Sequence, residues 1–418
     1  MNNNAQALHH AGAVHAEAGR SGKNVRSDCL VAITLRESGG IDLQLKSKVE
    51  VLYGRSIRAL TTDMLSFYDI DHASVSIEDS GALPYTIAAR LETAVRRLRP
   101  EETRCFLLPE REGLRGATPR DRFRRSRLYL PGNDPKLAIN AGVHAPDGII
   151  LDLEDSVAPT EKDAARLLVR NTLREVDFGG AERMVRINQL PLGLADLEVI
   201  IPQEPNLILI PKVESAAQVV AVDDRIESLR TSFGVDTPIH LMPIIESAKG
   251  AMFAYEIATA TTTVVALAIG LEDYTADIGA ERTLEGKESL WMRGAVLNAA
   301  RAAGVQAIDT VFSDVNDMDG LLASVREAKA LGFDGKGCIH PRQIAVVHAG
   351  FAPEETEIEK AKKIVRAFDE AQRQGLGVVS LGSKMIDPPV VKRALRTIDL
   401  ALRSGLLTEG WKEETHEG

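Results

Sequence analysis

The chain has 418 residues, a net charge of −10 and 44% hydrophobic residues, which is typical of a globular protein with two or three domains. Its acidic balance and its aromatic content of 4% argue against a nucleic-acid partner, which requires clustered positive charge and stacking rings. Three cysteines without a CxxC spacing argue against a zinc knuckle and a disulfide framework. The sequence has neither an 18-residue apolar run nor a secretory signal at its N-terminus, so we expect a cytoplasmic protein without membrane contact.

The first 103 residues divide into two predicted parts. Residues 1–27 are rich in Ala, Asn and His without periodicity, which predicts disorder. Residues 28–103 predict a small α/β domain, because β-rich runs and amphipathic stretches follow one another. The runs CLVAITL and IDLQLKS, separated by Gly39 and Gly40, predict a hairpin, and HASVSIED predicts a further strand. Helical spacing is present in VEVLYGRSIRALTTDMLSFY and in TIAARLETAVRRLR.

The remaining sequence predicts a linker, a barrel and a helical extension. Residues 104–124 mix charge, proline and glycine, which is typical of a linker. Over residues 125–350 helical stretches alternate with eight apolar runs, in the order SRLYLPG, DGIILDLED, RMVRIN, LILIPKV, HLMPIIES, VVALAIGLED, VQAIDTVF and GKGCIHP. Eight strand–helix units favour an α/β TIM barrel over a doubly wound sheet, and no GxGxxG segment follows a strand. Residues 351–418 predict a C-terminal helical segment that serves as a lid or in oligomerisation.

Most of the predicted strands end in a charged side chain, and most of these side chains are carboxylates. In a TIM barrel the C-terminal strand ends surround the active site, so these residues are expected to face one another. Glu246 and Asp273 end successive strands and are placed to share one metal ion, for which oxygen ligands favour Mg²⁺ or Mn²⁺. Arg186, two strands earlier, is placed to bind a substrate carboxylate with its fork of donors.

Each of these residues also has an ordinary structural interpretation. A carboxylate at a strand end commonly caps a helix, and Arg186 would serve equally as an ion-pair partner. Lys212 could form a Schiff base with a carbonyl substrate, but a salt bridge to Glu214 or its neighbours is the simpler interpretation. His340 precedes Pro341 and is typical of a hydrogen-bonded loop histidine.

Several of these segments resemble the citrate lyase β-subunit family of citryl-, citramalyl- and malyl-thioester lyases and related thioesterases. The resemblance covers about residues 125–405 and rests on RSRLYLPGNDPKLAINA, ILDLEDSVAPTEKDAAR, VRINQ, LIPKVES, PIIESAKG, GLEDYTADIGA, GFDGKGCIHPRQIAVV and GSKMIDPPVVKRA. It implies a TIM barrel, Mg²⁺, a CoA or CoA-like thioester as substrate carrier, and a homo-oligomer that is commonly trimeric.

The resemblance also implies roles for individual residues. Arg186 corresponds to the substrate arginine, Glu246 to a catalytic, substrate-binding and metal-binding carboxylate, and Asp273 to the second metal ligand. Asp387 corresponds to a mobile catalytic aspartate that, in related lyases, reaches the site of a neighbouring subunit. The positions that correspond to thioester contacts are Tyr129, Lys136, Ile308 and Asp309.

The N-terminal segment IEDSGALPYTIAARLETAV resembles the acyl-carrier γ-subunit of citrate lyase. That carrier attaches its prosthetic group to a serine, and an ungapped register places Arg26 at this position, with Ser21 and Ser27 nearby. The domain is therefore either a covalently modified carrier or a decayed one that is retained for assembly. A citrate-lyase-type α-subunit is an expected partner in either case.

Together these features predict a Mg²⁺-dependent carbon–carbon lyase that cleaves a 3-hydroxyacyl thioester into a 2-oxo acid and an acetyl thioester. The 2-oxo acid would be glyoxylate, pyruvate or oxaloacetate, and the carrier-like domain favours oxaloacetate. The alternatives are a thioesterase that uses the same site and a non-catalytic assembly subunit of a citrate-lyase-like complex.

Overall fold

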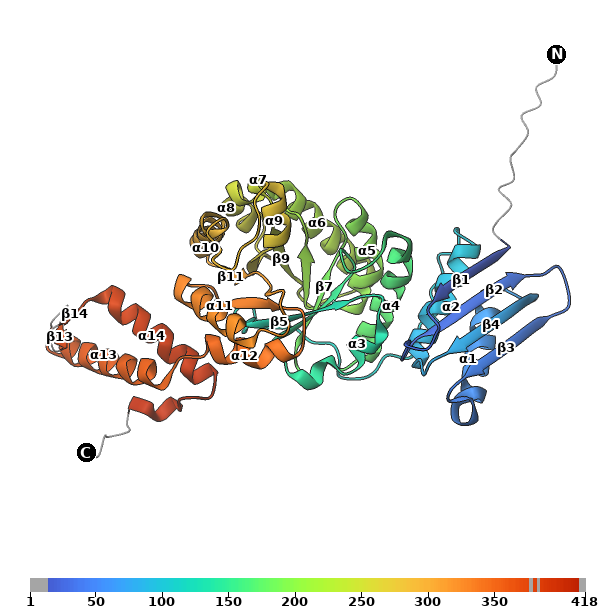
Figure 1. The fold of residues 1–418 in the computed structure, drawn as a ribbon, viewed down its shortest axis with the longest axis horizontal. Coiled ribbons are helices and arrows are strands. Elements are labelled where there is room, and N and C mark those ends of the chain that lie inside the picture. The colour runs from blue at the N-terminus through green and yellow to red at the C-terminus, as the bar shows by residue number, and fades with distance from the viewer. Residues whose placement is uncertain (1–13, 376–378, 382–383, 413–418) are drawn as a thin grey trace, which may run out of the picture.

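The computed structural model describes residues 14–375, 379–381 and 384–412. The chain forms three parts along its longest axis, which are a small α/β domain, a barrel and a pair of long helices (Figure 1). In the part of the chain that is described, every helix is too short or too polar to cross a lipid bilayer.

The N-terminal domain is a four-stranded sheet with two helices against one face. The strands lie in the order β1-β2-β4-β3, and alternate residues of β2 and β4 are buried. The elements are β1 (His15–Gly19), β2 (Cys29–Leu35), β3 (Ile41–Ser47), α1 (Glu50–Phe67), β4 (Ala73–Asp79) and α2 (Pro84–Leu98).

Two predictions for this domain are wrong. Residues 14–27 are not disordered, because β1 pairs with β2 and buries Ala16 and Ala18 in the domain core; residues 1–13 lie outside the described part. The strands β2 and β3 do not form a hairpin either, since β4 lies between them and pairs with both. Helix α1 makes the crossover that the parallel β3–β4 pair requires.

The central part is a closed barrel of eight parallel strands, which confirms the predicted TIM barrel. All eight apolar runs are strands, namely β5 (Ser126–Pro131), β6 (Gly148–Asp152), β7 (Glu182–Arg186), β8 (Leu207–Ile210), β9 (His240–Ile245), β10 (Ala266–Ile269), β11 (Gln306–Asp309) and β12 (Gly335–Cys338). The α-helices around them are α3 (Pro135–Ile139), α4 (Lys162–Glu175), α5 (Leu192–Ile200), α6 (Ala216–Phe233), α7 (Ala248–Met252), α8 (Ala254–Ala258), α9 (Leu271–Asp277), α10 (Leu290–Ala303), α11 (Met318–Leu331) and α12 (Arg342–Phe351).

The segment 104–124 contains neither helix nor strand and runs along the N-terminal ends of the barrel strands. Asn206 donates a 2.6 Å hydrogen bond to the carbonyl of Gly116, and Arg183 donates to the carbonyl of Leu114 at 3.1 Å. The segment therefore packs against the barrel rather than linking two independent bodies.

The C-terminal part consists of α13 (Glu355–Arg373), the strands β13 (Val379–Leu381) and β14 (Lys384–Ile386), and α14 (Pro388–Arg403). The two helices share a small core of their own and extend away from the barrel (Figure 1). Arg396 pairs with Asp334 at 2.8 Å, and Arg403 donates to the carbonyl of Asp121 at 2.7 Å. Both acceptors precede barrel strands, so α14 contacts the rim formed by the N-terminal ends of the strands.

Candidate active site

A cavity of about 400 Å³ opens at the C-terminal ends of the barrel strands. Its walls bring together four of the residues singled out from the sequence, which are Tyr129, Arg186, Glu246 and Asp273. They come from β5, β7 and the segments after β9 and β10, so the barrel gathers side chains that are far apart in the sequence.

Glu246 is a buried carboxylate in the wall of this cavity. Its side chain is 5% exposed and accepts a 2.7 Å hydrogen bond from the backbone N–H of Lys212. Burial, followed by repulsion from Asp273, raises the pKa of Glu246 to about 8. Gly270 makes room for it, because a Cβ at that position would lie 2.3 Å from its Oε2.

The backbone of Lys212 adopts the left-handed conformation, with φ of +50°. A non-glycine residue in this region costs about 1–3 kcal/mol, and such strain gathers at functional sites. In this conformation the backbone N–H of Lys212 points at the Glu246 carboxylate and donates a hydrogen bond to it.

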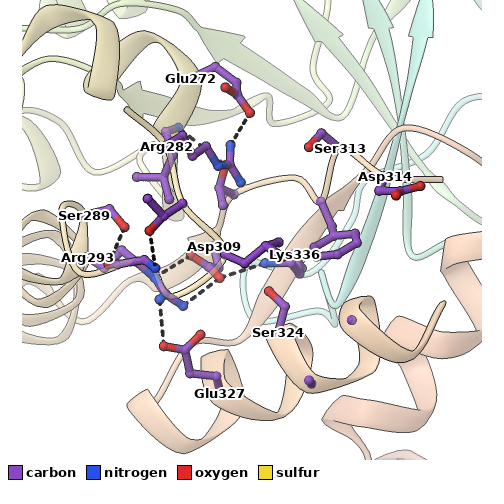
Figure 2. Close-up of a pocket in the computed structure, with 18 of the residues that line it drawn as sticks. Glu272, Arg282, Ser289, Arg293, Asp309, Ser313, Asp314, Ser324, Glu327 and Lys336 are labelled. Carbon is purple, nitrogen blue, oxygen red and sulfur yellow. Dashed lines mark hydrogen bonds and ion pairs between the residues drawn. The ribbon is translucent and has the colours of Figure 1, made fainter. Parts of the chain in front are cut away.

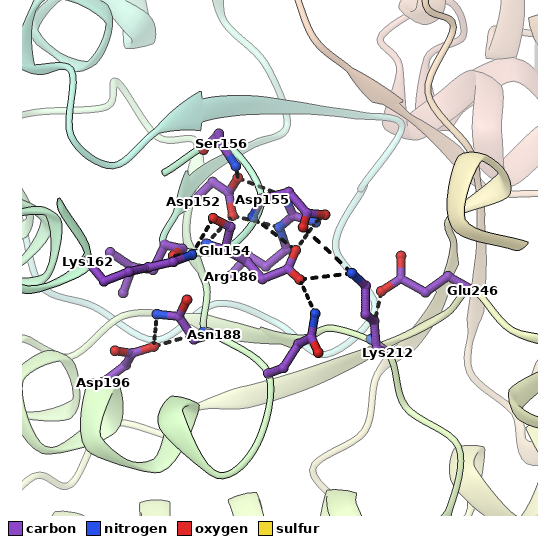
Figure 3. Close-up of polar contacts among 12 residues, drawn as sticks. Asp152, Glu154, Asp155, Ser156, Lys162, Arg186, Asn188, Asp196, Lys212 and Glu246 are labelled. Atoms are coloured by element: carbon purple, nitrogen blue, oxygen red, sulfur yellow. Dashed lines mark hydrogen bonds and ion pairs between the residues drawn. The ribbon is translucent and has the colours of Figure 1, made fainter. Parts of the chain in front are cut away.

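The ammonium group of Lys212 lies among three carboxylates of the site. Its Nζ is 3.4 Å from Glu154 and 3.7 Å from Asp155 (Figure 3), and 3.3 Å from Asp273. Burial opposes the charged form, but these carboxylates raise the pKa of Lys212 above its ordinary value. A Schiff-base lysine needs a neutral amine, so this environment disfavours the class I aldolase alternative.

The expected salt bridge from Lys212 to Glu214 is absent among the described contacts. Glu214 instead pairs with Lys249 at 3.2 Å and accepts a hydrogen bond from Ser247 at 3.0 Å.

Arg186 is held by the carboxylates that end β6. Its guanidinium donates to both oxygens of Asp152 at 2.6 and 2.7 Å and lies 2.9 Å from Glu154 (Figure 3). It also lies over the ring of Tyr129, 5.4 Å from the centroid. Although burial favours the neutral form, the pairing with Asp152 raises the pKa of Arg186, which stays charged.

The residues Asp152, Glu154 and Asp155 complete the site, but the sequence reasoning did not assign them a role. Their signal was present, because the run DLED ends a strand directly before the strand that carries Arg186. Neighbouring parallel strands place such residues beside one another at the rim.

The chemistry of these side chains fits a divalent cation. The site combines five carboxylates with two cationic groups, and among the described residues Glu246 forms no ion pair. Carboxylate oxygens suit Mg²⁺, which usually keeps several waters and takes only one or two protein carboxylates. Among the described residues, no group of three or more His, Cys, Asp or Glu side chains is arranged to hold a metal ion by itself.

Two of the predicted thioester contacts, Ile308 and Asp309, are buried and do not line this cavity. Ile308 lies in the barrel interior with no exposed surface. The Asp309 carboxylate accepts hydrogen bonds from Lys336 at 2.9 Å and from Arg293 at 3.1 and 3.2 Å (Figure 2). It lines a second cavity, of about 460 Å³, between α10 and α11. Its carboxylate is thus committed to an ion-pair network.

Two further predicted residues lie outside the cavity. Lys136 is an exposed residue of α3 and is not part of the cavity wall. Asp387 caps α14, where its carboxylate accepts a 3.1 Å hydrogen bond from the N–H of Val390. Arg396, nine residues later in α14, is the residue that contacts the barrel through Asp334. Asp387 therefore lies about 13 Å further along the helix, on the end that points away from the barrel. Asp387 therefore does not reach the site of its own chain in this structure.

The barrel and the N-terminal domain each match a known protein-family model. Residues 125–341 match the family model of HpcH/HpaI aldolase/citrate lyase. Residues 17–98 match a carrier-protein model described as malonate decarboxylase delta subunit. This match confirms the predicted carrier-like domain and extends it to include β1.

Curated relatives and a solved structure cover the same barrel. The citrate lyase subunit beta of Leuconostoc mesenteroides subsp. cremoris is 42% identical over 67% of this chain and 94% of its own length. The mitochondrial citramalyl-CoA lyase of Homo sapiens is 37% identical over 66% of this chain and 85% of its own length. The crystal structure of protein CitE from Mycobacterium tuberculosis in complex with magnesium, acetoacetate and coenzyme A is 31% identical, with a TM-score of 0.55, and covers 68% of this chain and 99% of its own. The chain therefore belongs to the HpcH/HpaI aldolase/citrate lyase family.

Proposed function

We propose that this chain is a Mg²⁺-dependent carbon–carbon lyase that cleaves a 3-hydroxyacyl thioester into a 2-oxo acid and an acetyl thioester. The observation that carries the proposal is the meeting of Glu246, Asp273 and Arg186 in one cavity at the catalytic rim. Family membership supports it, because relatives are named citrate lyase subunit beta and citramalyl-CoA lyase.

Glu246 and Asp273 would hold the metal ion. When bound, Mg²⁺ would supply Lewis-acid polarisation of the substrate oxygens, an effect of several kcal/mol on the barrier. The fit rests on the buried carboxylate of Glu246, which has no ion pair among the described residues, and the name of the magnesium complex of CitE agrees with it.

Arg186 would hold the carboxylate of the substrate. Asp152 orients the guanidinium by accepting two hydrogen bonds from it, and the ring of Tyr129 packs against its face. A substrate carboxylate would have to compete with Glu154 and Asp155 for the remaining donors. A net negative site favours this step only after a divalent cation has bound.

When the carbon–carbon bond breaks, the 3-hydroxyl group of the substrate would lose its proton to water as the new carbonyl forms, and Asp387 would donate a proton to the thioester carbon as the general acid. Its position at the outer end of α14 supports a role in the site of a neighbouring copy rather than in its own. The proposal therefore includes a homo-oligomer, commonly a trimer in this family, and a contact with a citrate-lyase-type α-subunit stays a prediction.

The thioester carrier would lie across the rim near β5 and β11. Tyr129 lines the cavity and Lys136 stands on the exposed helix that follows β5, which supports both as contacts of the carrier. The side chain of Ile308 is fully buried, so only its backbone could serve in this role. Asp309 lines the neighbouring cavity, where its carboxylate is paired with Lys336 and Arg293.

Hydrolysis of the thioester in the same site is the second candidate function. A (3S)-malyl-CoA thioesterase from Cereibacter sphaeroides is 36% identical to this chain over 93% of its own length. Such a reaction would release the free hydroxy acid instead of a 2-oxo acid.

The decisive experiment is to incubate the purified chain with Mg²⁺ and citryl-, citramalyl- or malyl-CoA and to measure 2-oxo acid release. We expect release that stops with EDTA and is lost in both Glu246→Ala and Asp273→Ala. A free hydroxy acid without 2-oxo acid would establish the thioesterase, and full activity in either variant would contradict the assignment. The preferred substrate identifies the acid, among glyoxylate, pyruvate and oxaloacetate.

A further inference from the structure

The N-terminal domain is closely docked against the barrel through α2 and α4. Glu92 and Arg170 form a two-pronged ion pair across the contact, at 2.8 and 2.9 Å, and both side chains are at most 2% exposed. Asn171 donates to the carbonyl of Tyr85 at 2.9 Å, while Tyr85 and Ala89 pack into the outer core of the barrel. A charge pair excluded from water to this extent indicates an interface that is closed rather than transient.

One connection from this domain ends on the loop that follows β5. Arg20 and Arg90 both donate to the carbonyl of Asn133, at 2.8 and 3.0 Å. The preceding residue, Gly132, donates its N–H to the carbonyl of Asp152 at 2.8 Å. Only glycine permits this approach, because a Cβ there would lie 2.6 Å from that carbonyl oxygen. The N-terminal domain thus contacts Asn133, and the adjacent Gly132 contacts Asp152, the ion-pair partner of Arg186.

A second connection ends on the 3-10 turn Pro159–Glu161 and on the first turn of α4, which follow β6. Arg97 donates hydrogen bonds to both carboxylate oxygens of Asp163 at 2.7 Å and to the carbonyl of Thr160 at 3.1 Å. Between these residues, Lys162 donates to the carbonyls of Leu153 and Glu154, at 2.8 and 2.6 Å. Arg97 also donates to the carbonyl of Glu17 in β1 at 2.7 Å, which ties this turn to the sheet of the N-terminal domain.

Both connections converge on residues 152–155, the carboxylate segment that holds Arg186 and Lys212. We propose that the carrier-like domain acts as a docked positioning domain, which orders this segment and thereby aims Arg186 at the substrate carboxylate. Arg97 and Arg20 are positioning residues in this scheme, since neither lines the catalytic cavity.

The first test measures the segment directly and does not depend on the proposed function. Hydrogen exchange followed by mass spectrometry should show faster exchange of peptides spanning 148–163 in Arg97→Ala than in the unmodified chain. The matched control is Arg36→Ala, which removes an exposed pair with Asp42 in the same domain and should leave these peptides unchanged. Equal protection in Arg97→Ala and the control would overturn the proposal.

The second test is kinetic and rests on the proposed lyase reaction. Because Arg186 would bind the carboxylate equally in the ground state and the transition state, loosening it should raise KM more than it lowers kcat. We expect Arg97→Ala and Arg20→Ala to raise KM about 5-fold with kcat within about 2-fold, and Arg97→Lys to restore part of the difference. A fall in kcat at constant KM would indicate a loss of folded enzyme and would contradict a positioning role.

The two tests separate the possible failures. If the unmodified chain releases no 2-oxo acid, the proposed function fails while the exchange comparison still decides the positioning role. Arg20 is 46% exposed, so Arg20→Ala provides a folded variant if Arg97→Ala unfolds.

Discussion

Asp152 and Arg186 form the closest two-pronged contact of the catalytic rim, with N···O distances of 2.6 and 2.7 Å. The carboxylate ends β6 and the guanidinium ends the adjacent strand β7, where the two residues are paired across the sheet. Burial alone would raise the pKa of Asp152, but the hydrogen bonds from Arg186 hold it below its ordinary value. The pair therefore stays ionised and fixes the plane in which Arg186 can receive a substrate carboxylate.

Replacement of Asp152 should damage the site more than replacement of its exposed neighbour. Asp152→Asn removes the charge that orients Arg186 toward the substrate, so we expect kcat/KM to fall about 100-fold, which is equivalent to about 3 kcal/mol of transition-state stabilisation. Asp155 is 52% exposed and lies 3.5 Å from the same guanidinium. Steady-state kinetics of Asp155→Asn should show less than about a 3-fold change, since exposed pairs contribute little. Equal effects of the two substitutions would argue against an orienting role for Asp152.

Binding of Mg²⁺ should be strongly dependent on pH. The pKa of Glu246 is raised to about 8 in the metal-free chain, so a ligand that must be ionised carries a proton at pH 7. Metal binding then releases this proton, and the affinity should rise up to about 10-fold per pH unit between pH 6 and pH 8 before it levels off. Calorimetric titrations in buffers of different ionisation enthalpy would measure both the affinity and the released proton.

The same pKa shift makes the metal-free chain less stable as pH rises, whereas the affinity for Mg²⁺ increases. Glu246 holds its proton more tightly in the folded state than at the ordinary value of 4.5, so its stabilising contribution is lost as pH rises toward 8. Asp273→Asn removes the second cause of the shift and should move the midpoint of this loss of stability to lower pH. An affinity for Mg²⁺ that is constant from pH 6 to pH 8 would contradict this account.

Asp387 should act between copies of the chain. Neither Asp387→Asn nor Glu246→Ala is expected to show turnover alone, because each lacks one part of the site. Coexpression of the two variants should restore activity, since some sites then combine an intact Glu246 with an intact Asp387 from a neighbour. With random assembly about a quarter of the sites in a closed oligomer would be complete. Mixtures that stay inactive, in oligomers shown to contain both variants, would oppose catalysis between subunits.

The N-terminal domain should carry no prosthetic group. An ungapped register places Arg26 at the carrier serine, and Ser27 is held in a left-handed conformation with its N–H bonded to the carbonyl of Ser80 at 3.0 Å. The docking through Glu92 and Arg170 would also restrain the movement that a carrier needs. Mass spectrometry of the intact chain should give the unmodified 45.3 kDa, whereas an adduct mapped to Ser21 or Ser27 would identify a working carrier.

The barrel was predictable from the sequence, and so was the convergence of Glu246 and Asp273 on one cavity. The eight apolar runs became the eight strands because a buried parallel strand is a local pattern, readable within a few residues. Glu246 and Asp273 could be paired in advance because the ends of neighbouring strands meet at one rim in any such barrel. The grouping of Arg186 with them follows from the same geometry.

The ion-pair partner of each charged side chain became clear from the three-dimensional arrangement alone. Asp309 ends a strand like the others, yet it is buried against Lys336 and Arg293 and is withdrawn from the site. The position of Asp387 on an outer helix and the docking of the N-terminal domain depend on contacts between segments far apart in the chain. Such contacts are set by burial and by the directions of side chains from different elements, and local periodicity does not encode either of them.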